Sequence, residues 1–258
     1  MNLTDDETLK FLKGSPVFID DICAVYPATI GEIIDIGYSK FQQYLGLLTS
    51  SKPVLKTGSE EMAQILDKLT DFQYILMIAT LDPEINLILK EAFHFFTHEQ
   101  ATFSLDPPQV VIGPLEEQHI LSEEKFYDFQ RLLKHMYFLE QDGEDIIIYP
   151  NDSPAIKALK RKMLENREKL RRAKAKQAER EKTDLKFSDL IASITINNCN
   201  LNIENIWNIT YYAFHDQLKR MGWRDQFDIN NRAALAGAKL KKNQLKHWMR
   251  SIANSDKS

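Results

Sequence analysis

The sequence predicts a mainly α-helical protein with a small β element, an α+β fold. Long segments carry apolar residues three or four positions apart, which is the spacing of one helix face. Only nine glycines occur in 258 residues, too few for an all-β fold with many tight turns. Three segments also differ sharply in charge. We therefore expect an acidic, mainly helical domain over residues 1–152, a basic helical linker over 153–182 and a C-terminal helical domain over 183–258.

The charge differences indicate the kind of partner. Residues 1–156 carry 26 acidic and 10 basic side chains, 157–182 carry 4 and 12, and 183–258 carry 7 and 11. The net charge of −4 conceals this division. Such asymmetry favours charged macromolecular partners or assembly over a small-molecule active site.

The acidic segment contains several helix signals. Thr29 and Glu32 form a capping-box pattern, and an apolar stripe at helical spacing runs from residue 30 to 48. Residues 51–59 are loop-like, and a second stripe follows Ser59 to residue 81. Pro83 is typical of the first turn of a further helix.

The rest of this segment holds the β element. Residues 15–19 predict a short strand, and residues 101–121, interrupted by prolines, predict a β-hairpin. Ser122 is a candidate cap for a helix over 124–139. The run 146–149 predicts a last strand, which we expect to pair with the hairpin.

The basic segment predicts one long helix that begins at Pro154, since residues 155–182 contain neither Gly nor Pro. A heptad-like seam becomes polar in its second half; its members are Ile156, Leu159, Met163, Asn166, Leu170, Ala173 and Gln177.

Three interpretations of this helix stay open. It is a solvated helix with i,i+4 ion pairs, or it contacts nucleic-acid phosphates, or it docks on an acidic protein surface such as residues 1–156 of a neighbouring copy. Arg167, Arg171 and Arg172 are candidate contact residues in either binding case. Because no helix-turn-helix or RNA-stacking motif accompanies the charges, we do not expect nucleic acid to be the main partner.

The C-terminal segment predicts a helix over 184–196, a loop over 197–202, a helix over 203–222 ending at Gly222, and further helical stretches to residue 254. It is rich in aromatic side chains, most of which we expect in a core. Trp223 and Trp248 neighbour charged residues, so they are the candidates for exposed anchors that bind a partner.

Candidate catalytic or metal groups are weak. His94 and His98 lie four apart, but the order H-E-x-x-H and a third ligand are missing. The acidic residues of 142–145 lack the alternation of a calcium loop and are typical of a turn. Cys199 and His215 have no orienting third group for nucleophilic catalysis. We expect no enzymatic activity, metal or cofactor.

The chain also lacks export and membrane signals. Its N-terminus is acidic without an apolar core segment, and no stretch approaches the ~20 apolar residues of a membrane span. Cys23 and Cys199 lie far apart in the sequence and form no C-x-x-C motif, so we expect both to be reduced thiols. We expect a cytosolic protein.

Two stretches resemble tail-assembly proteins of siphophages and prophages of Gram-positive bacteria. In IDDICAVYPATIGEIIDIGYSKFQQYLGLLT the similarity lies in the Tyr-Pro-x-Thr-Ile-x-Glu-Ile opening. In FSDLIASITINNCNLNIENIWNITYYAFHDQLKRMGWRDQFDINNRAALAGA and the following LKHWMRSI it lies in Ile206, Trp207, Ile209, Thr210, Tyr212, His215, Asp216, Leu218, Arg220 and Trp248. Together they cover about a third of the chain.

This resemblance implies a chaperone or scaffold for siphophage tails, without catalytic residues, that acts in the host cytoplasm. Its implied partners are tail proteins such as the tape measure and the tail tube, with self-association a further expectation. Trp207 and Tyr212 join Trp223 and Trp248 as candidate partner-binding residues. The alternative function is phosphate binding by the basic helix over 157–182.

Overall fold

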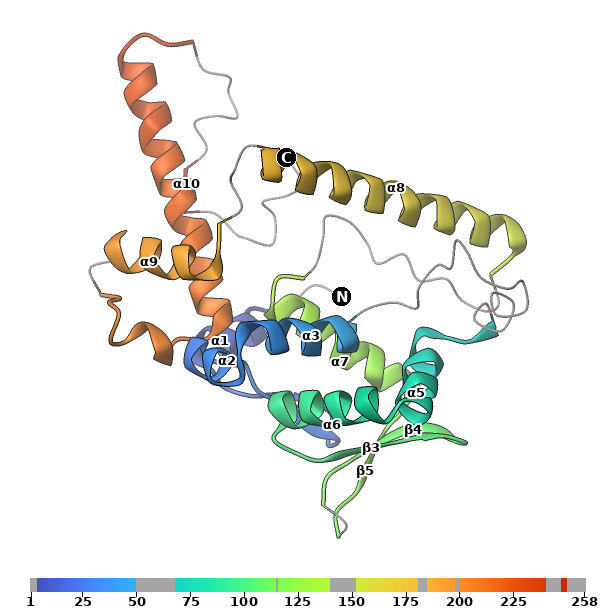
Figure 1. The fold of residues 1–258 in the computed structure, drawn as a ribbon. Coiled ribbons are helices and arrows are strands. Elements are labelled where there is room, and N and C mark those ends of the chain that lie inside the picture. Colours follow the sequence, from blue (N-terminus) through green and yellow to red (C-terminus); the bar gives the residue numbers. More distant parts are fainter. Residues whose placement is uncertain are drawn as a thin grey trace.

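The computed structural model describes residues 4–49, 68–114, 116–139, 152–180, 185–197, 200–239 and 247–249. These residues contain nine α-helices, one short 3-10 helix and two small antiparallel sheets (Figure 1). The predicted mainly helical fold with a small β element is confirmed. Four predicted features lie outside the described residues: the loop over 51–59, the turn over 142–145, the strand over 146–149 and Cys199.

The N-terminal elements are held by local caps. Thr4 with Glu7 and Thr29 with Glu32 each form a complete capping box, as predicted for the second pair. The predicted stripe over 30–48 forms two helices instead of one, because the chain turns at Gly37 with a positive φ of 90°. The elements are α1 (Asp5–Lys13), β1 (Val17–Ile19), β2 (Cys23–Val25), α2 (Ile30–Ile36) and α3 (Tyr38–Thr49).

Two helices and a sheet follow. The predicted helical stripe after Ser59 lies outside the described residues as far as residue 67, and its later part forms helix α5 (Asp71–Leu81). The Thr70 hydroxyl accepts a hydrogen bond from the Gln73 N–H and caps the first turn of α5. Helix α6 (Pro83–Thr97) begins at the predicted proline.

The predicted hairpin is confirmed and extended. Strands β3 (Ala101–Leu105), β4 (Pro108–Ile112) and β5 (His119–Leu121) form an antiparallel sheet in that order, and β5 was not predicted. Val110 pairs with Phe103 on one side and with Leu121 on the other. Helix α7 (Glu123–Met136) then starts after Ser122, whose side chain makes no capping hydrogen bond.

The C-terminal elements are α8 (Pro154–Arg180), α9 (Phe187–Asn197), the 3-10 helix η1 (Ile206–Asn208) and α10 (Tyr211–Leu235). The predicted helix over 203–222 is wrong at both ends. The chain is extended at Ile209, Thr210 caps the helix at its start, and the helix continues through Gly222.

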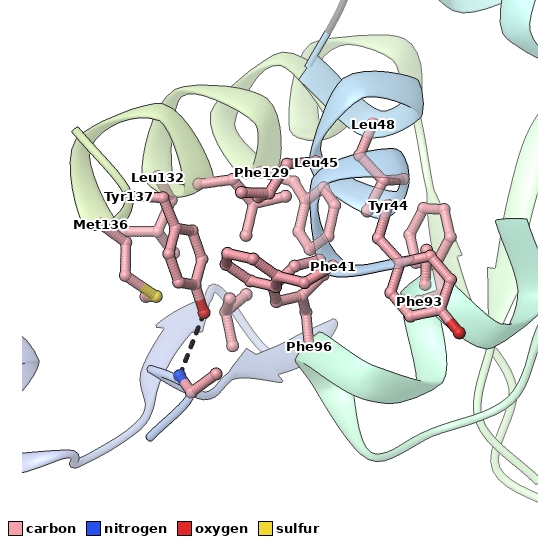
Figure 2. Packing of buried hydrophobic residues seen from close by; sticks show 14 of the residues in the cluster. Phe41, Tyr44, Leu45, Leu48, Phe93, Phe96, Phe129, Leu132, Met136 and Tyr137 are labelled. Carbon is pink, nitrogen blue, oxygen red and sulfur yellow. Dashed lines mark hydrogen bonds between the residues drawn. The ribbon is translucent and has the colours of Figure 1, made fainter. Parts of the chain in front are cut away.

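One cluster of buried side chains holds α1–α3, α5–α7 and both sheets together. Figure 2 shows its centre, where the rings of Phe41, Phe96 and Tyr137 lie against one another with centroids 5.3–6.3 Å apart. The buried Ala28 N–H donates to the Tyr137 Oη at 3.0 Å. This bond gives a partner to a backbone group that burial has removed from water.

The same cluster includes residues of the predicted C-terminal domain. Thr29 and Thr210 form an antiparallel bridge, and the Thr210 hydroxyl donates to the buried Phe11 carbonyl oxygen at 2.8 Å. Tyr211 lies 5.5 Å, between ring centroids, from both Phe41 and Tyr137. The start of α10 therefore completes the core of the N-terminal half. The division into separately folding domains at 152 and 183 stays a prediction.

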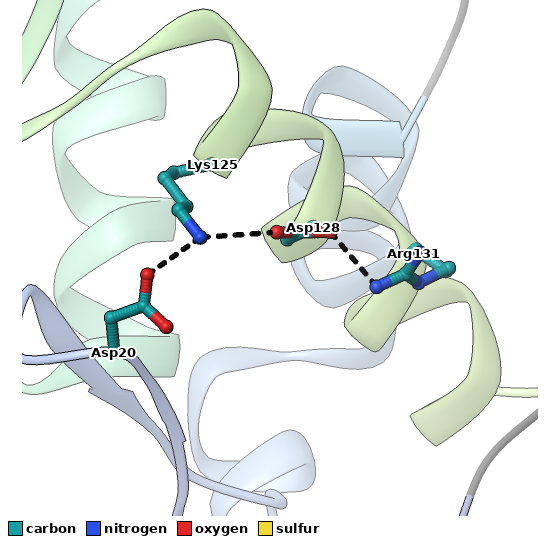
Figure 3. A network of polar contacts seen from close by, with 4 residues as sticks. All are labelled: Asp20, Lys125, Asp128 and Arg131. Carbon is teal, nitrogen blue, oxygen red and sulfur yellow. Dashed lines mark hydrogen bonds and ion pairs between the residues drawn. The ribbon is translucent and has the colours of Figure 1, made fainter. Parts of the chain in front are cut away.

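A polar network joins the hairpin formed by β1 and β2 to α7 (Figure 3). The Lys125 Nζ lies 2.6 Å from a carboxylate oxygen of Asp20 and 3.7 Å from a carboxylate oxygen of Asp128. The other carboxylate oxygen of Asp128 lies 2.8 Å from a guanidinium nitrogen of Arg131. The hydrogen bond to Asp20 raises the pKa of Lys125. Because the network is solvent-exposed, it orients the hairpin more than it stabilises the fold.

Candidate partner-binding surface

Helix α10 leaves the core after its first two turns. Its buried residues are Tyr211–Phe214 and Asp216, and none of the residues from 217 to 235 is buried. At 1.5 Å per residue, roughly 28 Å of helix extends beyond its last buried residue. Figure 1 shows α10 projecting away from α1 and α2, where it begins. Helices usually need packing of an apolar face to be stable, so this length, in which residues are half-buried or exposed, is a candidate site for a partner.

The start of α10 is anchored by aromatic contacts. The Tyr212 ring stacks on Phe138 at 4.8 Å and lies 5.3 Å from Phe11, and its side chain is buried. Trp207 in η1 is half-buried and packs against the core. Its carbonyl oxygen would lie 3.0 Å from a Cβ at position 31, where the chain has Gly31. Tyr212 and Trp207 thus pack within the chain, and the partner-contact role expected for them stays a prediction.

The anchor role predicted for Trp223 and Trp248 needs exposed side chains, which the structure does not show, and the role stays a prediction. Both are half-buried, and the Lys219 Nζ lies 5.6 Å from the Trp223 ring centroid. Trp248 stacks on His247 at 5.7 Å, and the His247 ring lies 5.1 Å from Phe227, one turn beyond Trp223. Residues 247–249 therefore lie against the same stretch of α10 that carries Trp223.

The structure adds apolar residues that the sequence did not single out. Ile229, Leu235 and Met249 have 61%, 89% and 68% of their surface exposed. We call the following set the distal α10 surface: Trp223, Phe227, Leu235, Trp248 and Met249. At about 100° per residue, Ile229 lies about 160° from Phe227 around the helix and faces away from this set. Exposed apolar groups gathered in one region are typical of interaction sites. The sequence did not mark Ile229, Leu235 and Met249 as exposed, because nothing in their spacing distinguishes them from core residues.

Charged and polar groups mark the point where α10 leaves the core. The Arg220 Nε donates to the Asp216 carboxylate at 2.8 Å, four residues apart on the helix. Beside them, His215 lies among the rings of Tyr211, Phe214 and Phe138. Its Nε2 is buried and has no hydrogen-bond partner among the described residues, and burial lowers its pKa to about 4. A neutral, aromatic-packed imidazole fits a packing role better than that of a catalytic base.

The remaining candidate groups have structural surroundings. The His98 ring stacks on Tyr26 at 4.1 Å, and within the described ranges no cluster of three metal-ligating side chains occurs. Burial raises the pKa of the Cys23 thiol to about 12, so this thiol is protonated at neutral pH. None of the helices that the structure describes combines the length and hydrophobicity of a membrane span.

The other candidate contact residues lie on α8. Arg167, Arg171 and Arg172 are within its helical backbone, and their side chains fall outside the described part of the structure. Among the described side chains of α8, Ile156, Leu159 and Met163 of the heptad-like seam are all exposed.

Comparison with known proteins concerns the C-terminal part of the chain. The family model described as the YomV second domain matches residues 175–253. That range includes α9, η1, α10 and every residue of the distal α10 surface. The family is phage-associated, of the Bacillus prophage YomV type, so the similarity supports a phage-related protein. No curated protein and no solved structure matches the chain significantly.

Proposed function

We propose that the chain is a non-enzymatic tail-assembly chaperone or scaffold of a tailed phage or prophage. It binds tail proteins such as the tape measure or the tail tube in the cytoplasm of the host, and it uses the distal α10 surface. One observation carries the proposal: a helix with exposed apolar side chains leaves the core within the region similar to a phage-associated domain.

The mechanism is reversible burial of apolar surface. A helical segment of a tail protein packs against Trp223, Phe227 and Leu235, which lie within about 120° of one another around the helix at 3.6 residues per turn. Its own apolar face is thereby kept from aggregating. Fully burying an aliphatic side chain contributes about 1.5–3 kcal/mol. Association and side-chain ordering cost at least about 4 kcal/mol. A few such contacts therefore give the weak, releasable binding that an assembly chaperone needs.

The test is co-expression with the tail proteins encoded beside this gene, followed by co-purification and light scattering. We expect at least one tail protein to stay soluble in a defined complex with the wild-type chain. The variant Leu235→Asp places a charge in the contact, and we expect the tail protein to precipitate or the complex to be lost.

Ile229→Asp is the matched control, because Ile229 is also exposed on α10 but faces at least about 120° away from Trp223, Phe227 and Leu235. This control is expected to keep the complex. A chain that binds none of the tail proteins, or equal loss in both variants, would contradict the proposed function.

A further inference from the structure

We propose that α8 is the docking site for an acidic amphipathic helix of another protein, which packs along α8 as in a two-stranded coiled coil. The inference names a partner for a surface that the proposed function does not use, and it does not depend on the tail-assembly role.

The first step is the apolar seam. Ile156, Leu159 and Met163 expose 45%, 60% and 46% of their surface on a helix that is continuous from Pro154 to Arg180. The next seam position is the polar Asn166, and Leu170 and Ala173 then follow at the same spacing of four and three. Figure 1 shows α8 as a rod set apart from the α3 and α7 layer. A seam of this spacing suits one partner helix.

The second step is the charge beside the seam. With Ile156 at heptad position a, the flanking e and g positions of the next heptads are all basic: Lys160, Lys162, Arg167, Lys169, Lys174 and Lys176. The acidic residues within the helix, Glu165, Glu168 and Glu179, fall at positions c and f, away from the seam. Of the charged positions, only e and g lie beside a partner helix. Their uniform positive charge therefore selects partners with Glu or Asp at their own e and g positions.

The third step excludes a second copy of α8 as the partner. A parallel pair places Lys162 opposite Arg167 and Lys169 opposite Lys174, and an antiparallel pair also places basic rows together. Like charges at these positions destabilise the pair. One of the basic flanking residues already pairs with a carboxylate within the chain, because the Lys160 Nζ lies 2.6 Å from the Asp152 carboxylate.

The seam also favours a protein partner over nucleic acid. Phosphate contacts need positive charge and do not need apolar residues between two basic rows. Four basic residues, Lys157, Arg161, Arg171 and Arg172, lie away from the seam. A partner that recognised positive charge alone would bind these residues as well as those beside the seam.

The probe is a synthetic amphipathic peptide of four heptads with Ile and Leu at a and d and Glu at e and g. Its binding to the full chain is measured by fluorescence anisotropy. A second peptide has Lys at e and g, and a duplex DNA oligonucleotide is measured in parallel. We expect the acidic peptide to bind at least about tenfold more tightly than the lysine peptide, because only the former complements the basic rows.

Two charge-reversal variants separate the seam from overall charge. Lys162→Glu with Lys169→Glu changes the flanking rows, and Arg171→Glu with Arg172→Glu makes the same change in net charge off the seam. We expect the first pair of substitutions to weaken binding of the acidic peptide by about tenfold or more and to create binding of the lysine peptide. The second pair should keep most of the affinity for the acidic peptide. Circular dichroism checks that each variant is folded, and Leu159→Ser tests the apolar contact without changing charge.

Four outcomes overturn the inference: no binding of the acidic peptide, equal losses in both charge variants, tighter binding of the DNA than of the acidic peptide, or self-association that Leu159→Ser abolishes. Because the probe is synthetic, the result is independent of whether any tail protein binds.

Discussion

At the residue scale, caps and packing give single side chains clear roles. The Asp82 carboxylate accepts from the Glu84 and Ile85 N–H groups, and Thr29 forms its box with Glu32. Such contacts span four residues or fewer, so the sequence can predict them. The burial of His215 depends on Phe138, which lies 77 residues away along the chain, and no local pattern reveals it.

His215 should make stability depend on pH. Burial lowers its pKa from 6.5 to about 4 in the folded chain, while the unfolded chain keeps the usual value. The unfolded chain therefore binds a proton between these values that the folded chain does not. The stability contributed by neutral His215 is complete above pH 6.5 and is lost as the pH falls toward 4. We expect the unfolding free energy to fall by about 2 kcal/mol from this group between pH 7 and 4.5.

Urea unfolding of the wild type and of His215→Phe at both pH values measures this effect. The variant keeps an aromatic ring among Phe138, Tyr211 and Phe214 but cannot take up a proton, so its stability should change less over the same range. His119→Phe, on an exposed position of β5, controls for the loss of a histidine. An unchanged difference between the two pH values in His215→Phe would contradict the assignment.

At the scale of elements, two glycines have opposite roles that their sequence contexts did not separate. Gly37 lies between α2 and α3 with a φ of 90°, which residues with a Cβ rarely adopt. Gly222 lies inside α10, and a Cβ there would meet no atom within 4 Å. The predicted helix end at Gly222 was wrong because glycine weakens a helix without ending it.

The two substitutions to alanine should therefore shift the melting temperature in opposite directions. Gly222→Ala should stabilise by about 0.5–1 kcal/mol, because alanine loses less backbone entropy in a helix. Gly37→Ala should destabilise by about 1–3 kcal/mol, because the backbone conformation becomes strained. Thermal unfolding followed by circular dichroism measures both, and a stabilised Gly37→Ala would show that the turn at Gly37 is not required.

At the scale of the whole molecule, segments distant in sequence share one core. Tyr211 and Phe214 of α10 belong to the same buried cluster as Phe11, Phe41 and Tyr137. The backbone also joins them, since the Tyr211 N–H donates to the Ala28 carbonyl oxygen at 2.9 Å. This arrangement predicts that residues on both sides of the charged helix unfold together.

Tyr137→Phe tests this coupling. The substitution leaves the buried Ala28 N–H without its acceptor and should cost about 1–3 kcal/mol. All three tryptophans lie at positions 207, 223 and 248, so tryptophan fluorescence reports on the C-terminal part, while circular dichroism reports on all helices. We expect the urea midpoints from the two signals to coincide and to fall together in Tyr137→Phe.

The control is Tyr127→Phe, since the half-buried Tyr127 hydroxyl donates to Glu123 at 3.3 Å and should contribute less. A fluorescence midpoint that stays fixed while the dichroism midpoint falls would mean that residues 183–258 unfold as a separate domain, as the charge pattern alone had suggested.

The sequence by itself determined the helical class, the cap at Thr29, the helix start at Pro83, the hairpin over 101–112 and the long basic helix, because each depends on contacts or periodicity within a few residues. Only the tertiary structure decided that Tyr212 is buried, that α10 leaves the core after Asp216, and that Ile229 and Leu235 are exposed. Apolar spacing marks a face of a helix, but whether another element covers that face depends on residues far away in the chain, such as Phe11 and Phe138.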